Sequence, residues 1–197
     1  MKRLFDIIAA TIALLLTLPL WIGISVLIIV DSRGAVFYKQ QRIGHNGRPL
    51  MIYKFRTMIQ EADRTNKLLT VGTRDDRITR AGFYLRKFKI DELPQLINVL
   101  KGEMSLVGPR PEVAKYVDQY NPEQRQVLTV KPGLTDYASI QYADENELLE
   151  QYDDPEKAYI QHIMPDKLRL NLMYIENQGM WTDVKILART VWRLMRI

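Results

Sequence analysis

The feature that most constrains this chain is an apolar segment near its N-terminus. Residues 7–30 read IIAATIALLLTLPLWIGISVLIIV and contain no charged side chain. As a straight α-helix this segment would be about 36 Å long, enough to cross the hydrocarbon core of a bilayer. The apolar stretch is too long for a cleaved signal peptide, and no small-residue cleavage pattern follows it. We therefore predict a membrane-embedded helix that stays attached to the chain.

Two further features bear on how this helix meets the membrane. Leu18-Pro19 lies mid-segment, where a proline removes a backbone hydrogen bond and kinks a helix. Basic residues flank both ends of the segment, namely Lys2, Arg3, Arg33, Lys39, Arg42 and Arg48. Basic flanks favour the cytoplasmic side, so both ends are expected there. A re-entrant helix–break–helix accounts for both features, and a kinked spanning helix is the alternative.

Composition narrows the classes of function. The 197 residues are 47% hydrophobic and 26% charged, which suits one globular domain with a buried core. The chain has no cysteine, which excludes a thiol nucleophile, a disulfide framework and a thiolate zinc site. His45 and His162 are isolated, so a Ser-His-Asp triad has little support. The formal charge of +5 suits phosphates or anionic lipid, but the basic residues are too dispersed to indicate a nucleic-acid partner.

Periodicity predicts a small hairpin followed by mostly helical structure. Residues 35–39 and 49–56 resemble strands, and Asn46-Gly47 between them is a hairpin turn signal. Helices are predicted over 58–69, 79–88, 91–100, 111–120, 122–130, 154–162, 165–177 and 182–197. The stretches 71–77 and 130–140 are predicted as loops. The helix over 182–197 has an apolar face and a basic stripe, so it either docks on the core or lies on lipid headgroups.

An adjacent pair of acids, Asp91 and Glu92, follows a basic run and begins the predicted helix over 91–100. One interpretation makes Asp91 an ordinary N-cap and Glu92 a first-turn acid. The other interpretation gives the pair a catalytic role, because carboxylates can act as phosphoryl-accepting nucleophiles. A glycosidase is disfavoured, since adjacent helical residues point about 100° apart and cannot easily flank one sugar bond.

Basic residues suggest what such a carboxylate would attack. Arg86 lies just before the acids, and Arg110 is held between two prolines. Lys54 and Arg56 end the second predicted strand. Guanidinium and ammonium groups suit phosphate oxygens. A carboxylate that attacks a diphosphate needs such cations to screen the negative charge, and a metal such as Mg²⁺ is expected to assist them.

Four stretches of the chain resemble a known family, the bacterial sugar transferases, which are monotopic phosphoglycosyl transferases. They are KRLFDIIAA at 2–10, YKFRTM at 53–58, LRKFKIDELPQLINVLKGEMSLVGPRPE at 85–112 and KPGLTDYASI at 131–140. The third stretch is long and very specific. The resemblance implies a small, minimal member of the family, without the multispan region of larger relatives.

What the resemblance implies is a reaction. A phospho-sugar would pass from a UDP-sugar to a polyprenol phosphate in the bilayer with release of UMP, as the first membrane step of glycan assembly. Asp91 maps onto the nucleophile, which forms a covalent aspartyl phospho-sugar and holds Mg²⁺. Glu92 maps onto its assisting partner. Arg86 and Arg110 map onto phosphate-binding positions, and Lys54 is a weaker candidate.

The resemblance also implies an architecture. We expect an α/β fold that is mostly helical, with a re-entrant membrane helix over 1–32 that breaks at Leu18 and Pro19. Residues 33–197 would form a compact cytosolic catalytic domain with a small β-hairpin and interfacial amphipathic helices. The protein would be monotopic, on the cytoplasmic face of the bacterial inner membrane.

Two departures from the family pattern limit what is predicted. The break lacks the serine of the Ser-Pro found in several members. The loop at 131–140 continues without the Gly-Trp pair and the Asn-Gly-Arg of many members. The sugar, the glycan pathway and the oligomeric state are therefore not predicted. Two alternatives stay open: direct transfer with Asp91 as base, and a non-catalytic, membrane-anchored module that binds anionic lipid or a glycan-assembly partner.

Overall fold

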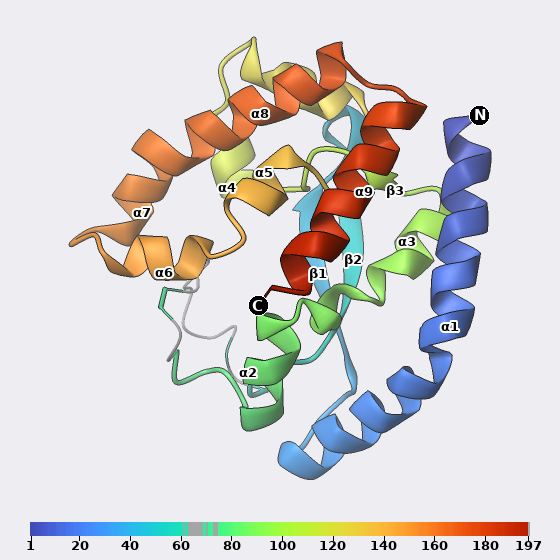
Figure 1. Cartoon of the computed structure of the whole chain (residues 1–197). Coiled ribbons are helices and arrows are strands. Elements are labelled where there is room, and N and C mark those ends of the chain that lie inside the picture. Colours follow the sequence, from blue (N-terminus) through green and yellow to red (C-terminus); the bar gives the residue numbers. More distant parts are fainter. Residues whose placement is uncertain (61, 63–68, 70, 73–74, 197) are drawn as a thin grey trace.

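A long N-terminal helix, α1 (Lys2–Asp31), lies along one side of a mostly helical domain and bends part-way along its length (Figure 1). The computed structural model describes residues 1–60, 62, 69, 71–72 and 75–196. The helix runs unbroken through Leu18 and Pro19, so the predicted break is a bend and not an interruption. Pro19 lacks the N–H that would donate to the preceding turn, and we attribute the bend to it. By length and composition, α1 could cross a membrane.

The N-terminal end of α1 is anchored to the domain by two polar side chains, Lys2 and Asp6. Lys2 forms an ion pair with Asp183 and donates to the carbonyl of Val107 at 3.1 Å. Asp6, which is buried, accepts from the Ser105 hydroxyl at 2.8 Å. These contacts join the start of α1 to the strand that contains Ser105 and Val107.

The C-terminal end of α1 is anchored to the same domain. The buried Arg56 donates to the carbonyls of Ser32 and Arg33, each at 2.6 Å. Asp31 accepts from the backbone N–H of Ala81 at 2.9 Å. Arg56, expected beside Lys54 at a phosphate site, therefore caps α1 instead, because the last carbonyls of a helix need donors.

The predicted hairpin is confirmed. Strands β1 (Phe37–Ile43) and β2 (Pro49–Phe55) pair antiparallel. The turn between them contains Asn46, whose φ of 56° is the left-handed conformation that asparagine tolerates well. Trp21 of α1 packs edge-on against Phe55, with ring centroids 5.3 Å apart. The hairpin is therefore held against the membrane-type helix.

The stretch predicted as a loop over 130–140 is instead structured. It contains strand β4 (Gly133–Thr135), which pairs in parallel with β3 (Ser105–Val107), and then helix α5 (Tyr137–Gln141). The pairing depends on Gly108 and Gly133, since a Cβ on Gly133 would lie only 2.1 Å from the Gly108 nitrogen. The prediction missed β4 because a three-residue strand leaves no periodic signal.

The other helices and helical turns are α2 (Arg80–Lys87), η3 (Ile90–Glu92), α3 (Gln95–Lys101), α4 (Ala114–Val117), η4 (Gln124–Thr129), α6 (Glu145–Glu150), α7 (Pro155–Ala158), η5 (Tyr159–Ile163), α8 (Met164–Glu176) and α9 (Met180–Leu194), with η1 (His45–Gly47) inside the hairpin turn. They agree largely with the prediction, except that α6 was not predicted. The predicted helix over 111–120 is reduced to the single turn α4, and that over 122–130 is the 3-10 turn η4. The predicted helix over 58–69 falls largely outside the described residues. In the predicted loop over 71–77 only residues 73 and 74 do, and the others form no helix or strand, as expected.

Helix α9 packs on the core through one face and leaves another open. Ile186 is fully buried in a core cluster with Val99, Met104 and Tyr174. On other faces of α9, large apolar side chains are exposed, namely Trp181, Val191, Trp192 and Met195. The predicted docking of this helix on the core is therefore confirmed. The exposed apolar side chains make no comparable contact with the described part of the domain.

Candidate active site

The two acids lie in a tight turn between α2 and α3. Lys89 adopts a left-handed conformation, with φ of 55°, and reverses the chain before the 3-10 turn η3. Asp91 and Glu92 both belong to this turn, and α3 begins only at Gln95. The expectation that Asp91 caps a helix over 91–100 is therefore wrong. Neither acid caps α3, because the 3-10 turn and Pro94 separate them from its first turn.

Glu92 is held between two cations. Arg110 donates to both of its carboxylate oxygens, to Oε2 at 2.9 Å, and Lys54 donates to Oε1 at 3.3 Å. Burial alone would raise the pKa of Glu92, but Arg110 and then Lys54 bring that pKa well below its usual value. In turn, the charge of Glu92 raises the pKa of Arg110. These shifts favour the charged forms of Glu92 and Arg110, whereas burial lowers the pKa of Lys54 and the charge of Glu92 opposes that shift.

Asp91 lies in a different environment from its neighbour. Its side chain is buried, and its Oδ1 atom has no hydrogen-bond partner among the described residues. Burial, and then the charge of Glu92, raises the pKa of Asp91, while Lys54 and Arg86 act in the opposite direction. A buried carboxylate oxygen without a partner is uncommon in native proteins and marks an atom left for a ligand.

Arg86 reaches the site from the last turn of α2. Its Nε donates to the Thr57 hydroxyl at 3.0 Å. Burial lowers the pKa of Arg86, and the negative charge of Asp91 opposes that shift. The structure thus brings Lys54 from β2, Arg86 from α2 and Arg110 from the loop after β3 around the two acids. All five predicted site residues lie together.

Sequence reasoning missed two buried residues that hold the site in place. Asp136 is fully buried, accepts from the backbone N–H of Arg110 at 3.2 Å, and caps α5. Asn98, also fully buried, joins α3 to β2 by accepting from the N–H of Tyr53 and donating to the carbonyl of Met51. Asn98 interrupts the apolar face of α3, and this interruption could have indicated from the sequence that Asn98 has a structural role.

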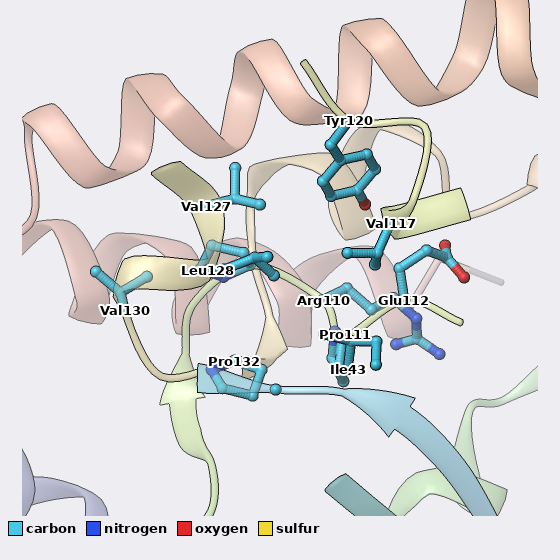
Figure 2. A pocket seen from close by; sticks show the side chains of 12 residues that line it. Ile43, Arg110, Pro111, Glu112, Val117, Tyr120, Val127, Leu128, Val130 and Pro132 are labelled. Atoms are coloured by element: carbon cyan, nitrogen blue, oxygen red, sulfur yellow. The ribbon is translucent and has the colours of Figure 1, made fainter. Parts of the chain in front are cut away.

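Behind the Arg110 loop, Glu112 forms a second buried cluster. It accepts from Arg42 at 2.7 Å and from the Tyr159 hydroxyl at 2.6 Å. Figure 2 shows the charged ends of Arg110 and Glu112 on the side of a pocket away from Val130 and Pro132. The pocket has about 20 Å³ of space for water-sized molecules, room for little more than one water. It is therefore a packing gap and not a sugar site.

Comparison with known proteins places these residues in a family. The whole chain, residues 1–197, matches the sequence profile of the bacterial sugar transferases. The chain belongs to this family. The resemblance predicted from the four motifs is therefore confirmed.

Several curated relatives of this sugar transferase carry informative names. It is 38% identical over 193 residues to the UDP-N-acetylgalactosamine-undecaprenyl-phosphate N-acetylgalactosaminephosphotransferase of Aeromonas hydrophila. It is 37% identical over 203 residues to the UDP-glucose:undecaprenyl-phosphate glucose-1-phosphate transferase of Escherichia coli strain K12. It is 37% identical over 195 residues to the uncharacterized sugar transferase EpsL of Bacillus subtilis strain 168.

The lengths of these relatives differ. The matches include 96%, 98% and 99% of this chain, respectively. They include only 42% of the Aeromonas protein and 40% of the Escherichia protein, but 87% of the Bacillus protein. The chain therefore spans about two fifths of the length of the first two relatives.

Proposed function

We propose that this protein transfers a sugar 1-phosphate from a UDP-sugar to a membrane polyprenol phosphate and releases UMP. The observation that carries the proposal is the buried, unpartnered Oδ1 of Asp91, placed among Lys54, Arg86 and Arg110. The donor and acceptor classes come from the names of the Aeromonas and Escherichia relatives. The first membrane step of glycan assembly is the role that this reaction would serve.

In the proposed first step, Oδ1 of Asp91 attacks the phosphorus that carries the sugar. An acyl phosphate bond forms between Oδ1 of Asp91 and that phosphorus, the bond from the phosphorus to the bridging oxygen breaks, and UMP leaves with that oxygen. In the second step, a phosphate oxygen of the polyprenol phosphate attacks the same phosphorus and releases the Asp91 carboxylate. Both steps bring anions together, and Arg86, Arg110 and Lys54 are placed to reduce that repulsion.

The residues present also fit Mg²⁺. Mg²⁺ commonly binds through one or two carboxylates together with substrate phosphates and waters. Oδ1 of Asp91 is a free carboxylate oxygen, and no cluster of three acidic or histidine ligands occurs within the described residues. Asp91 would therefore hold the ion together with the substrate, and the ion would neutralise charge that develops on the diphosphate.

The membrane arrangement that we propose is re-entrant. Lys2 at one end of α1 and Asp31 at the other both contact the same domain. If α1 spanned the bilayer, that domain would have to lie on both sides. We also propose that the exposed apolar side chains of α9 lie at the membrane interface, on the cytoplasmic face of the inner membrane, beside its stripe of basic residues.

The test is an assay of the purified full chain in nanodiscs with Mg²⁺ and a panel of UDP-sugars, with and without polyprenol phosphate. We expect acceptor-dependent UMP release, and an Asp91→Asn variant slowed by at least about a thousandfold, since it loses the nucleophile. Intact-protein mass should show a phospho-sugar adduct on the wild type that acceptor removes. The matched control is Asp118→Asn, an exposed aspartate on α4's end, which should keep full activity.

Other outcomes would redirect the proposal. Acceptor-dependent UMP without any adduct, even in rapid-quench samples, would favour direct transfer with Asp91 as base. No UMP from any donor, with the protein folded, would overturn the transferase and leave the non-catalytic anchor.

A further inference from the structure

The cations best placed for a phosphate are already engaged by an acid of the protein itself. Arg110 presents two N–H groups to Glu92, and Lys54 donates to the same carboxylate. The fork of a guanidinium matches a carboxylate and a phosphate in the same way, so one edge serves one partner at a time. In the free protein, that edge of Arg110 is taken.

The three side chains differ in how open they are to an incoming ligand. The side chain of Arg110 is 34% exposed, whereas those of Glu92 and Lys54 are 13% and 16% exposed. An incoming anion therefore reaches Arg110 before Glu92 has moved. During such an exchange Arg110 always has an anionic partner, so its guanidinium is never left as an unpaired charge, which would be costly.

A phosphate bound beside an unmoved Glu92 would face two carboxylates at close range. Asp91 and Glu92 are adjacent in η3, and the charge of Glu92 already acts on Asp91. A diphosphate adds further negative charge to this turn. Transfer of Arg110, and with it Lys54, from Glu92 to the phosphate relieves part of that repulsion.

From this arrangement we propose that Glu92 is a stand-in for substrate phosphate. Its carboxylate occupies the Arg110–Lys54 anion site in the free protein, and a phosphate group of the nucleoside diphosphate sugar displaces it on binding. Glu92 thus keeps the two cations oriented while the site is empty. The inference deepens the proposed function and rests on it for the identity of the ligand.

The experiment measures binding and not turnover. Inorganic pyrophosphate is titrated calorimetrically into the full chain in nanodiscs, with EDTA present so that no divalent metal contributes. We expect Glu92→Gln to bind pyrophosphate at least about tenfold more tightly than the wild type, because the competing charge is gone. If Glu92 instead helps to bind phosphate, or only supports the fold, Glu92→Gln should bind pyrophosphate more weakly than the wild type or equally well.

Two matched variants locate the effect. Glu145→Gln removes a carboxylate whose charge also acts on Arg110, but which pairs with Lys167, so it should change affinity by much less than Glu92→Gln. In the double variant Glu92→Gln with Arg110→Gln, the gain in affinity should disappear. Should Glu92→Gln fail to fold, Glu92→Asp serves in its place, because its shorter side chain cannot keep both contacts, and it too should bind more tightly.

The outcomes are distinct from those of the transferase assay. Equal or weaker pyrophosphate binding by the folded Glu92 variant overturns the exchange, as does a failure of both proteins to bind. Tighter binding in the Glu145→Gln variant to the same extent would also overturn it, since the effect would then be one of net charge. Absence of UMP release by the wild type would overturn the proposed reaction but would leave the exchange at Arg110 measurable.

Discussion

Two neighbouring carboxylates in one turn have opposite electrostatic environments. Glu92 has a lowered pKa because Arg110 and Lys54 hold it, whereas burial raises the pKa of Asp91. Pairs of acids whose pKa values are driven apart in this way usually serve different roles in catalysis. The proposed roles, attack for Asp91 and cation binding for Glu92, rest on these partners.

Glu112, which lies outside the group of residues proposed to act on the substrate, allows a test of how a paired carboxylate affects stability. Burial would raise its pKa, but Arg42 and Lys167 bring that pKa below the ordinary value of 4.5. A lowered folded-state pKa means that ionised Glu112 stabilises the protein above about pH 4.5, and that this stabilisation is lost as the pH falls toward the folded pKa. We therefore expect Glu112→Gln to cost about 2 kcal/mol at pH 7.

The measurement is the thermal midpoint of both proteins between pH 7 and pH 4. The gap between wild type and Glu112→Gln should be largest at pH 7 and should narrow below about pH 4.5, as the wild-type carboxyl begins to protonate. Glu123→Gln, an exposed acid, is the control and should match the wild type throughout. A gap that stays constant with pH would show that the charge of Glu112 is not its cause.

Among the elements, the short pair β3–β4 contributes most directly to the site. The N–H of Gly108 donates to the carbonyl of Thr135 at 3.0 Å, and that of Gly133 donates to the carbonyl of Pro109 at 2.9 Å. These bonds fix the backbone on which Arg110 follows. The pair is close enough to do so only because both contacting residues lack a side chain.

Gly133→Ala tests this dependence. Its Cβ would lie 2.1 Å from the Gly108 nitrogen and 2.4 Å from the Gly108 oxygen, and backbone atoms cannot move aside as a flexible side chain can. We expect a loss of stability of about 2–4 kcal/mol and a loss of transferase activity larger than the fall in stability explains. The readouts are the thermal midpoint and UMP release below that midpoint.

The control for this variant is Gly23→Ala. A Cβ added at Gly23 would have no heavy atom of the described residues within 4 Å, apart from the backbone of its own helix, and alanine favours a helix more than glycine does. Its stability should be unchanged or slightly higher. Equal behaviour of the two alanine variants would contradict the role given to the glycine contact.

At the scale of the whole molecule, α1 is part of the domain as well as its proposed membrane segment. Straight, its 30 residues would extend about 45 Å, yet both ends bond to the same domain. The bend makes this geometry possible. Its N-terminal end contacts the strand that leads to the Arg110 loop, and its C-terminal end contacts Arg56 and the start of α2.

Cysteine labelling tests this arrangement cleanly, because the chain has no cysteine of its own. Single cysteines are placed before Met1, at Ala35 and, through Trp192→Cys, on the exposed side of α9. With a membrane-impermeant maleimide, the first two should react in inverted inner-membrane vesicles and not in intact spheroplasts. Trp192→Cys should react slowly in inverted vesicles and quickly in detergent. Opposite labelling of the two ends of α1 would show a spanning helix.

The sequence by itself determined the family, the hairpin and the apolar N-terminal segment, and it named five candidate site residues that the structure brings together. These predictions rest on local signals: a run of uncharged residues, a period of two, an Asn-Gly turn and a contiguous motif around Asp91 and Glu92. Such signals can be recognised from the sequence alone because the residues that produce them are near neighbours along the chain.

The tertiary structure decided what the side chains do. It moved Arg56 from the phosphate site to the end of α1, removed Asp91 from the helix cap, and paired β3 with a stretch that looked like a loop. It also placed Arg110 on Glu92 and left Asp91 with a free oxygen. Each of these depends on contacts between distant parts of the chain. Whether a charged group is paired or free is set by its neighbours in space, and a pattern along the sequence does not contain that information.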